Sequence, residues 1–485
     1  MSREEDYTVT NARKLRAERI RENLSNFETG QTVNADVDAV VTGGLFTKGL
    51  DKDADTLLPN EAEVMKLLLA MERGTVADLE AVSIIGPRKL ANPLAAFLTE
   101  LQGGDAYGFT MPAPPAVGSA EAAADMIEVY EMALNRDTDF ATLNFGTPNT
   151  DITRATTNTG QSQANLFRGV APGCADGPYV SQFLIHDVPL GAHTLVQKYM
   201  ERTGTYGITD AHYKTISEGG IPVAQTTSSE KYICNGRTLG SVCHNDLVYQ
   251  QYLYAMAILN DYSAPLNGAF SNPANSGAFV TNGGAAQIST AVGAVAANAL
   301  STTWVQKWRH HLRLRPEEMA ARVEKNYAGL HSDLTSSSTV TKINEQGTKY
   351  LPMIYAEGSP MHPSYPAGHA VIAGACTTLL KMFYAEAAWS TISNDVWHSV
   401  NGTDRVEFDM DGHNALTIHG ELNKIAANIS RGRDFAGVHY RTDSDLGMEL
   451  GEKVAMAWFK DNIARQIESV GTITFVGFDG TTKTV

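Results

Sequence analysis

The residues best suited to chemistry lie in the segment His362-Pro-Ser-Tyr-Pro-Ala-Gly-His369, where two imidazoles flank a turn broken by proline and glycine. An apolar run typical of a helix, residues 370–380, begins directly after it. The segment is therefore a loop that leads into a helix N-terminus, where free backbone N–H groups attract anions and Gly368 permits close approach. Taken alone, it is equally consistent with a surface turn whose histidines are incidental.

A second group of candidates lies in the basic run 304–316, which carries four permanent cations within nine residues of an acidic protein. Pro316 disfavours helical geometry at Arg315, so the helix ends or bends there and Arg315 can turn away from the helix surface. Lys307 and Arg315 would then converge on one point from two directions. A solvated basic face is the simpler interpretation of such a run on its own.

The third segment, residues 433–443, contains an arginine six residues before a histidine and a carboxylate four residues after that histidine. Helical spacing would put Asp443 one turn from His439, where its carboxylate accepts from Nδ1 and leaves Nε2 as a lone pair for a metal or an electrophile. A purely structural pair is the alternative. Together, the three segments supply a lysine, two arginines, a glycine amide and two or three imidazoles, which suit a tetrahedral or trigonal-bipyramidal oxyanion.

Helices must position these three segments. Apolar residues recur at helical spacing in residues 8–27, 60–73, 90–101, 120–134, 247–260, 286–314, 370–388, 416–429 and 442–467. The stretches between them are rich in turn residues: 138–187 is predicted as a long connection with short helices, 267–286 as a linker or surface excursion, and the tail as a hairpin around Asp479-Gly480. The sequence predicts a mainly α protein of packed helical bundles with few short strands. We expect a single domain over 1–485, with the site-bearing helices in about 286–467.

Composition restricts the possible partners. The chain has 54 acidic and 38 basic residues, a net charge of −16, which repels nucleic acid and anionic membranes. No apolar run is long enough to span a membrane. The N-terminus lacks the apolar core of a secretory signal, so a cytoplasmic protein or a mature form is expected.

Metal sites of the common kinds are not indicated. The cysteines are Cys174, Cys234, Cys243 and Cys376. None has zinc spacing, and Cys234 and Cys243 either pair or remain free thiols, so the compartment stays open. Residues 51–55 resemble the opening of a calcium loop, but Thr56 and Ala62 stand where such a loop needs glycine and glutamate, which argues against calcium.

The combined pattern Lys-x7-Arg-Pro, Pro-x-Gly-His and Arg-x5-His-x3-Asp resembles the signature of the vanadium-dependent haloperoxidases, which share it with the type 2 phosphatidic acid phosphatase superfamily. Within that group it is most similar to the algal and cyanobacterial bromoperoxidases, through His-Pro-Ser-Tyr-Pro-x-Gly-His-Ala, Gly-Val-His-Tyr-Arg and the seven-residue gap between lysine and arginine. The stretches 46–50 and 180–184 also resemble that branch.

The resemblance implies roles for individual residues. It implies a vanadate-binding set of Lys307, Arg315, Gly368, His369, Arg433 and His439, with His439 as the axial ligand to the metal. It implies a catalytic set of Lys307, His362, His369, His439 and Asp443, in which His369 acts as the acid–base. It implies a halide pocket formed by Trp304, His362 and Ala367.

Two positions depart from the family pattern. Ala367 stands where the family has a serine, so one hydroxyl that bonds a vanadate oxygen is missing, at a cost of about 1 kcal/mol in binding if water substitutes. Gly432 stands where the superfamily often has a serine before the arginine.

The function implied by the resemblance is oxidation of bromide or iodide with hydrogen peroxide to hypohalous acid, which halogenates small organic acceptors. Vanadate is the implied cofactor, with phosphate as an alternative occupant of the vanadium-free form, and a homo-oligomer of at least two subunits is implied. An acid phosphatase that uses His439 as nucleophile at the same site is the main alternative. A non-catalytic oxyanion-binding or scaffold protein, with Ala367 as a mark of decay, is disfavoured because the lysine, both arginines and all three histidines are present.

Overall fold

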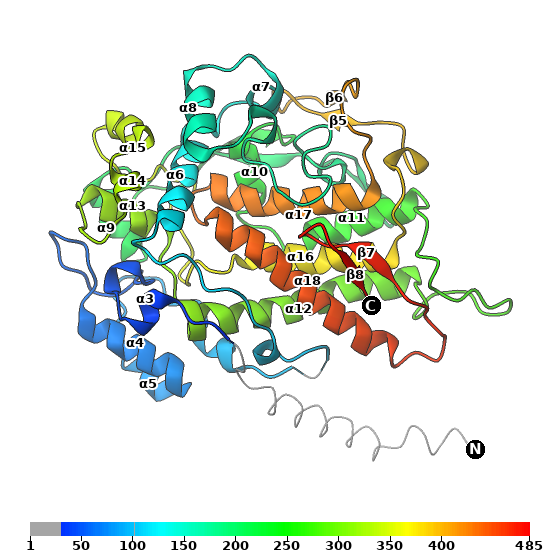
Figure 1. Ribbon diagram of the computed structural model, residues 1–485, viewed down its shortest axis with the longest axis horizontal. Helices are drawn as coiled ribbons and strands as arrows, with labels where there is room; N and C mark the ends of the chain where they lie inside the picture. Colours follow the sequence, from blue (N-terminus) through cyan, green and yellow to red (C-terminus); the bar gives the residue numbers. More distant parts are fainter. Residues whose placement is uncertain (1–30, 101) are drawn as a thin grey trace.

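The computed structural model describes residues 31–100 and 102–485, so the helix predicted at 8–27 lies outside the described residues. Four long helices form the centre of the molecule (Figure 1): α12 (Ala285–Val305), α16 (Gly368–Phe383), α17 (Ile418–Phe435) and α18 (Arg441–Ile463). They come from the C-terminal half of the chain and pack against one another. No described helix combines the length and the apolar character needed to cross a membrane.

Glycines allow the central helices to approach closely. A Cβ atom on Gly374 of α16 would lie 2.1 Å from the carbonyl oxygen of Met448 in α18, and one on Gly451 would lie 2.0 Å from the carbonyl oxygen of Val371. Only glycine fits at such distances. This close packing brings the N-termini of α16 and α18 together, where the Ala367 amide donates to the Asp443 carbonyl at 3.0 Å.

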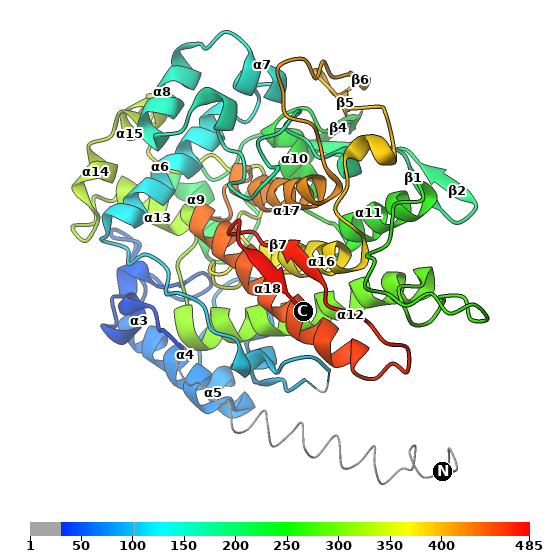
Figure 2. The ribbon, with the colours of Figure 1, turned by 45° about the vertical axis from the view of Figure 1, so that its right-hand side comes forward.

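The other helices surround this centre (Figure 2). They are α3 (Ala35–Asp38), α4 (Glu61–Arg73), α5 (Val76–Glu80), α6 (Ala120–Asn135), α7 (Phe140–Phe145), α8 (Thr150–Thr159), α9 (Asp210–Ser217), α10 (Gly236–Val242), α11 (Gln250–Asp261), α13 (Pro316–Glu324), α14 (Ser332–Thr335) and α15 (Ser338–Ile343). A π-helical turn, Gln306–His311, continues α12.

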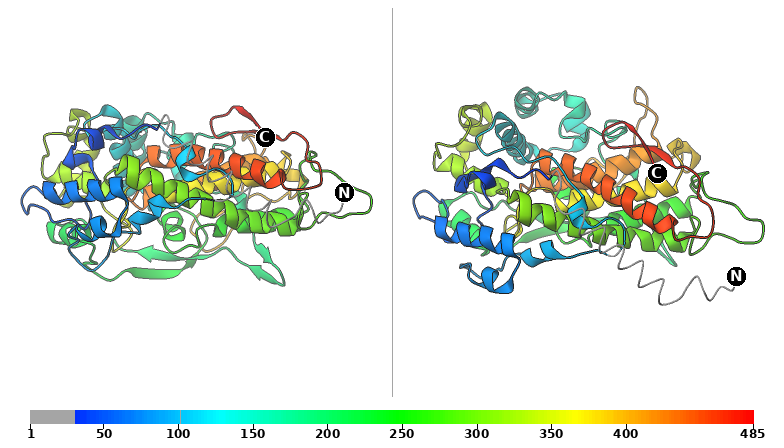
Figure 3. Two further views of the ribbon diagram at one scale, coloured as in Figure 1. Left: turned by 90° about the horizontal axis from the view of Figure 1, so that it is seen from below. Right: turned by 60° about the horizontal axis from the view of Figure 1, so that its bottom comes forward.

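The strands are short and pair only two at a time, always antiparallel. They are β1 (Val188–Leu190), β2 (His193–Leu195), β3 (Tyr199–Thr203), β4 (Thr226–Lys231), β5 (Trp397–His398), β6 (Val406–Glu407), β7 (Thr474–Val476) and β8 (Thr482–Thr484). Seen from below, the strands of the 188–231 region lie along one face of the helical body (Figure 3, left). The prediction of a mainly α protein with few short strands is confirmed, as is the hairpin around Asp479-Gly480.

One predicted helix is wrong. In the helix predicted at 90–101, the described residues 90–100 contain a single 3₁₀ turn, Pro93–Phe97, because Asn92 before it is left-handed (φ 42°) and Leu98 after it is extended. The other helices predicted in the described residues are present, with ends that differ by a few residues. The largest difference is α17, which continues to Phe435 and so carries Arg433 in its last turn.

Candidate active site

The N-terminus of α16 offers free backbone donors, as the sequence predicted. Ala367 is the N-cap residue and its side chain makes no capping hydrogen bond. Within the described residues, the amides of Gly368, His369 and Ala370 donate to no protein acceptor. A Cβ atom on Gly368 would contact only a methyl group of Thr303, at 3.9 Å, so the face in front of these amides is open to a small anion.

Lys307 lies on the π-helical turn that follows α12. Such turns are uncommon and are frequent at functional sites. The side chain is fully buried, and Nζ donates to the carbonyl oxygens of Pro363 at 2.6 Å and Ser364 at 2.8 Å. Burial, and next the neighbouring Arg315, hold the pKa of Lys307 well below its ordinary value. Lys307 is thus bound to the central loop predicted from the sequence.

Arg315 is extended, as predicted, and Pro316 begins α13 directly after it. Its Nε donates to the His362 carbonyl at 2.9 Å, and one terminal nitrogen donates to the Val438 carbonyl at 2.7 Å and to His439 Nε2 at 3.0 Å. Burial, and then the charge of Arg433, lower the pKa of Arg315 to about 9. This guanidinium therefore joins all three predicted segments.

His439 lies in the loop between α17 and α18, so the predicted helical geometry is wrong although the predicted contact is present. Asp443 sits in the first turn of α18, and its Oδ2 accepts from His439 Nδ1 at 2.9 Å. Because arginine only donates, the contact from Arg315 shows that Nε2 of His439 carries a lone pair. Burial, Arg315 and Lys307 hold the pKa of His439 well below its ordinary value, so the ring is neutral.

Arg433, in the last turn of α17, extends along Tyr355. Its guanidinium lies 5.3 Å from the centre of that ring and donates to the Cys243 carbonyl at 2.7 Å. Its Nε is buried and meets no acceptor in the described part of the chain. At Gly432, a Cβ atom would lie 2.8 Å from the sulfur of Cys243 and 2.9 Å from the carbonyl oxygen of Leu239, so the serine found elsewhere in the superfamily would not fit here.

His369 is partly accessible, with its side chain 24% exposed. Its Nε2 donates to Asp246 Oδ1 at 3.0 Å. Burial would raise the pKa of Asp246, but the neighbouring His369 lowers it below its ordinary value. Asp246 is therefore an anionic acceptor that orients His369, which suits an acid–base role.

His362 and Trp304 lie together beside Arg315. Their ring centroids are 5.0 Å apart, and the second terminal nitrogen of Arg315 donates to His362 Nδ1 at 2.9 Å. Burial, then Arg315 and Lys307, hold the pKa of His362 well below its ordinary value. Trp304 is fixed by a 3.0 Å hydrogen bond from its indole to the Ala91 carbonyl.

The structure thus brings the predicted segments into one buried site with an excess of positive charge. Lys307, Arg315 and Arg433 form no ion pair with any carboxylate among residues 31–100 and 102–485. Donors without acceptors, cations without anions and one imidazole lone pair can together hold an oxyanion and coordinate its central atom.

Sequence reasoning missed several residues that support the site: Asp125, Asp246, Arg313, Tyr355 and Ser364. Arg313 and Ser364 lie inside the motifs but carry no distinguishing mark there. The others come from distant segments with no local signal.

Metal and disulfide chemistry was left partly open by the sequence. All four cysteines are buried free thiols, so Cys234 and Cys243 do not pair. In residues 51–55, Asp53 accepts from amides of its own turn. The described residues contain no group of three or more His, Cys, Asp and Glu side chains arranged to hold a metal ion.

Comparison with known proteins identifies relatives of one kind. A family model for the VCPO second helical-bundle domain matches residues 287–466. A vanadium-dependent bromoperoxidase of Ascophyllum nodosum is 29% identical over 410 residues, which cover 76% of this chain and 72% of the relative. One from Corallina pilulifera is 28% identical over 549 residues and 90% of each chain.

A solved structure extends this likeness to the fold. The homohexameric second vanadate-dependent bromoperoxidase of Ascophyllum nodosum superposes with a TM-score of 0.88 at 24% identity, covering 98% of this chain and 90% of that one. At this identity the superposition establishes the fold, in which the three site segments lie at the ends of the central helices and in the adjoining loops.

Proposed function

We propose, from the premise that this chain belongs to the vanadium-dependent haloperoxidases, that it oxidises bromide or iodide with hydrogen peroxide to hypohalous acid, which halogenates small organic acceptors. One observation carries the proposal: in the described part of the chain, three buried cations without carboxylate partners surround an imidazole nitrogen that carries a lone pair and no proton. Buried charges are normally paired or bound to an ion. An oxyanion at this position would supply the missing negative charge.

The residues present fit vanadate. His439 Nε2 would be the protein ligand, Lys307, Arg315 and Arg433 would offset the charge of the oxygens, and the amide of Gly368 would donate to one of them. The orphaned Nε of Arg433 is a donor of the required kind. When bound, vanadate supplies a Lewis-acidic centre that activates hydrogen peroxide without a change of oxidation state.

The chain's own residues orient the reactants and handle protons. The N–H of Arg315 that donates to His439 Nε2 would donate to the oxyanion instead, while the other bonds of the guanidinium, to the His362 and Val438 carbonyls, keep it in place. Lys307 would donate to the oxygen that halide attacks and make it more electrophilic. Because Asp246 holds its Nε2 proton, His369 would accept and return protons through Nδ1 as peroxide enters.

The halide would approach along Trp304 and His362. Both rings lie beside Arg315, and the neutral state of His362 leaves a weakly polar wall that suits a large, weakly hydrated anion such as bromide or iodide. Chloride, which is harder to oxidise, is the less suitable substrate.

Three further features belong to the same proposal. Phosphate, with the same tetrahedral shape, would occupy the site in the vanadium-free form. The chain would form homo-oligomers, as the homohexameric bromoperoxidase of Ascophyllum nodosum does. A cytoplasmic location or a mature form also stays a prediction.

The test is bromination of a chromogenic organic acceptor with peroxide and bromide, with and without added orthovanadate, beside turnover of a chromogenic phosphate ester. We expect bromination that depends on vanadate. Ester turnover without bromination would instead favour the phosphatase, and absence of both activities would favour an oxyanion-binding protein. Either result would overturn the proposal.

A further inference from the structure

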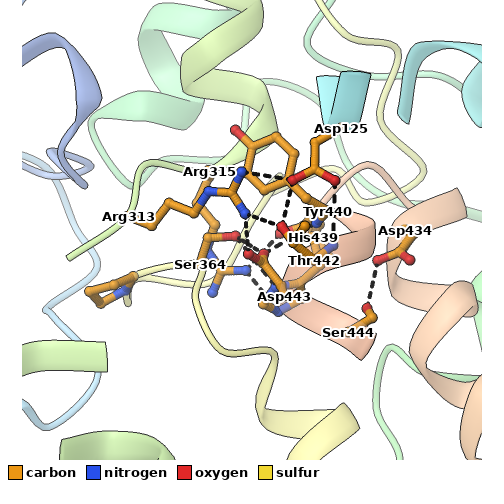
Figure 4. Close-up of polar contacts among 12 residues, drawn as sticks. Asp125, Arg313, Arg315, Ser364, Asp434, His439, Tyr440, Thr442, Asp443 and Ser444 are labelled. Atoms are coloured by element: carbon orange, nitrogen blue, oxygen red, sulfur yellow. Dashed lines mark hydrogen bonds and ion pairs between the residues drawn. The ribbon is translucent and has the colours of Figure 1, made fainter. Parts of the chain in front are cut away.

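Arg313 is a buried arginine two residues before Arg315, and none of the roles described so far uses it. One terminal nitrogen donates to Thr442 Oγ1 and to Asp443 Oδ1, each at 2.7 Å. The other donates to Asp125 Oδ2 at 2.9 Å. Figure 4 shows its guanidinium between the two carboxylates, on the side of Asp443 opposite to His439.

The contacts form a continuous chain from helix α6 to the imidazole: Asp125, Arg313, Asp443 and His439. Asp443 divides its two oxygens between neighbours. Oδ1 accepts from Arg313, whereas Oδ2 accepts from His439 Nδ1, from the hydroxyl of Ser364 and, at 3.2 Å, from the Tyr440 amide. Arg313 is thus the contact that holds the other end of the carboxylate, and the direction in which Oδ2 points depends on it together with these donors.

Arg313 remains charged and is held in one orientation. Burial alone would lower its pKa, but Asp443 and Asp125 outweigh burial and raise it, so the guanidinium stays charged. The Cζ atom of its guanidinium lies 4.0 Å from the ring centre of Tyr440, a contact that restricts rotation of the side chain. Its main chain adds a further link, because the Ser364 amide donates to the Arg313 carbonyl at 2.9 Å.

We propose that Arg313 is a positioning residue for the vanadate ligand: by fixing Asp443 Oδ1 it aims Oδ2 at Nδ1 of His439 and keeps Nε2 directed into the oxyanion site. Outer contacts of this kind fix the tautomer and the ring orientation of metal-binding histidines. Arg313 itself touches no part of the oxyanion position. This inference rests on the proposed function, because it assigns a role toward the same ligand.

Orthovanadate and inorganic phosphate binding to the full-length chain, measured by calorimetry, tests the inference. Arg313→Lys keeps the charge but cannot contact Asp125, Thr442 and Asp443 in one plane. We expect it to weaken vanadate binding by about 10- to 100-fold. Phosphate binding should weaken less, because phosphate would make no bond to Nε2 and would depend on the cations and the amides of α16.

Two further variants separate positioning from general stability. Arg168→Lys is the matched control, since Arg168 is equally buried but donates only to main-chain carbonyls of residues 174–177, away from Asp443. It should lower the unfolding temperature without changing vanadate affinity. Asp125→Asn preserves shape and weakens only the far end of the chain of contacts, so it keeps the test informative if Arg313→Lys fails to fold, and we expect a loss of a few fold.

A double-mutant cycle gives the decisive result. If Arg313 acts through Asp443, Arg313→Lys should lower vanadate affinity much less in an Asp443→Asn background than in the wild type. Equal losses in the two backgrounds, or wild-type vanadate affinity in Arg313→Lys, would overturn the inference. Failure of the wild-type chain to bind vanadate at all would instead overturn the proposed function.

Discussion

Two groups of buried cations lie side by side in this molecule and differ in their partners. The oxyanion cluster consists of Lys307, Arg315 and Arg433, none of which pairs with a carboxylate in the described chain. The ion-pair cluster consists of Arg431 and Arg441 with the carboxylates of Glu128, Asp434 and Asp445. Arg431 and Arg433 are only two residues apart on α17, yet they face opposite environments.

The pKa values of the arginines and the lysine show which of the two clusters has its positive charge neutralised by protein carboxylates. Although burial opposes it, the neighbouring carboxylates raise the pKa of both Arg431 and Arg441. In the oxyanion cluster the carboxylate of Asp443 offsets burial only in part, so the pKa of Arg315 falls to about 9 and that of Lys307 lies well below its ordinary value. A buried charge without a partner is unfavourable in free energy, and an anion bound at this cluster would remove that penalty.

The largest expected effect comes from removal of the imidazole lone pair that lies beside the oxyanion cluster. His439→Ala should weaken vanadate binding by more than about 100-fold, because even the loss of outer-shell contacts to a metal ligand costs about 10- to 100-fold. Calorimetry with orthovanadate measures the loss. Phosphate should still bind, since the three cations remain. Normal halide oxidation by this variant would show that the metal is held elsewhere.

Matched arginine variants test the comparison directly. Arg315→Met should lower phosphate affinity by about 10- to 150-fold, which corresponds to one charge-assisted hydrogen bond of about 1.5–3 kcal/mol, and should change the free energy of unfolding little. Arg431→Met should do the reverse. It leaves Asp434 buried without its arginine partner, so we expect a loss of about 3–5 kcal/mol in stability and little change in phosphate affinity.

Urea unfolding and calorimetry on both variants give the two quantities. The comparison fails if Arg315→Met destabilises the protein as much as Arg431→Met does, because Arg315 would then be a structural cation. It also fails if Arg431→Met abolishes phosphate binding in a protein that remains folded.

The ion-pair cluster has its own imbalance, which predicts a pH dependence. It contains three carboxylates for two guanidiniums, and burial, with Glu128 adding to it and Arg431 opposing it, raises the pKa of Asp434 to about 7. Between pH 4 and 7, roughly, folded Asp434 holds a proton that the unfolded chain has released. This contribution to stability is therefore full at acidic pH and is lost as pH rises toward 7, by at most about 1.4 kcal/mol per pH unit.

Urea unfolding at pH 5 and pH 7 measures this effect, and Asp434→Asn is the control. The variant cannot titrate, so its stability should fall less between the two pH values than that of the wild type. Equal slopes would show that Asp434 is ionised throughout and that the cluster balances its charge in another way.

Several parts of the oxyanion cluster could be predicted from the sequence because their causes are local. Pro316 fixes the extended backbone of Arg315, and the change from a Pro/Gly-rich loop to an apolar run marks the start of α16. The convergence of the three segments came from the resemblance to a family, since spacing alone does not bring distant helices together.

Other parts depend on packing and carry no local signal. The π-helical turn at Lys307 continues the apolar pattern of α12, so it looks like ordinary helix in the sequence. His439 contacts Asp443 from a loop. The four-residue spacing between them is also that of neighbours on one face of a helix, so the sequence predicted a helix there. Asp125 and Asp246 contact the site from helices and loops far away in the chain, and a single carboxylate there has no distinguishing neighbours.

The smallest expected effect concerns the missing serine at the N-terminus of α16. Ala367 is extended (φ −69°, ψ 121°), close to the backbone of Asn60 (φ −64°, ψ 118°), whose side chain caps α4. Ala367→Ser should therefore cap α16 and raise the free energy of unfolding by about 0.5–1 kcal/mol. Because the hydroxyl competes for the same amides but can also donate to a bound oxygen, vanadate affinity should rise by no more than a few fold.

The matched control is Ser119→Ala in α6, where an existing serine cap accepts from the Ala122 amide and its loss should cost about the same stability without affecting vanadate binding. Urea unfolding and calorimetry on both variants separate the capping effect from the ligand effect. If Ala367→Ser stabilised the protein but weakened vanadate binding, the oxyanion would gain more from the free amides of α16 than from the serine hydroxyl. The free amides at the N-terminus of α16 would then contribute to oxyanion binding together with the three cations of the oxyanion cluster.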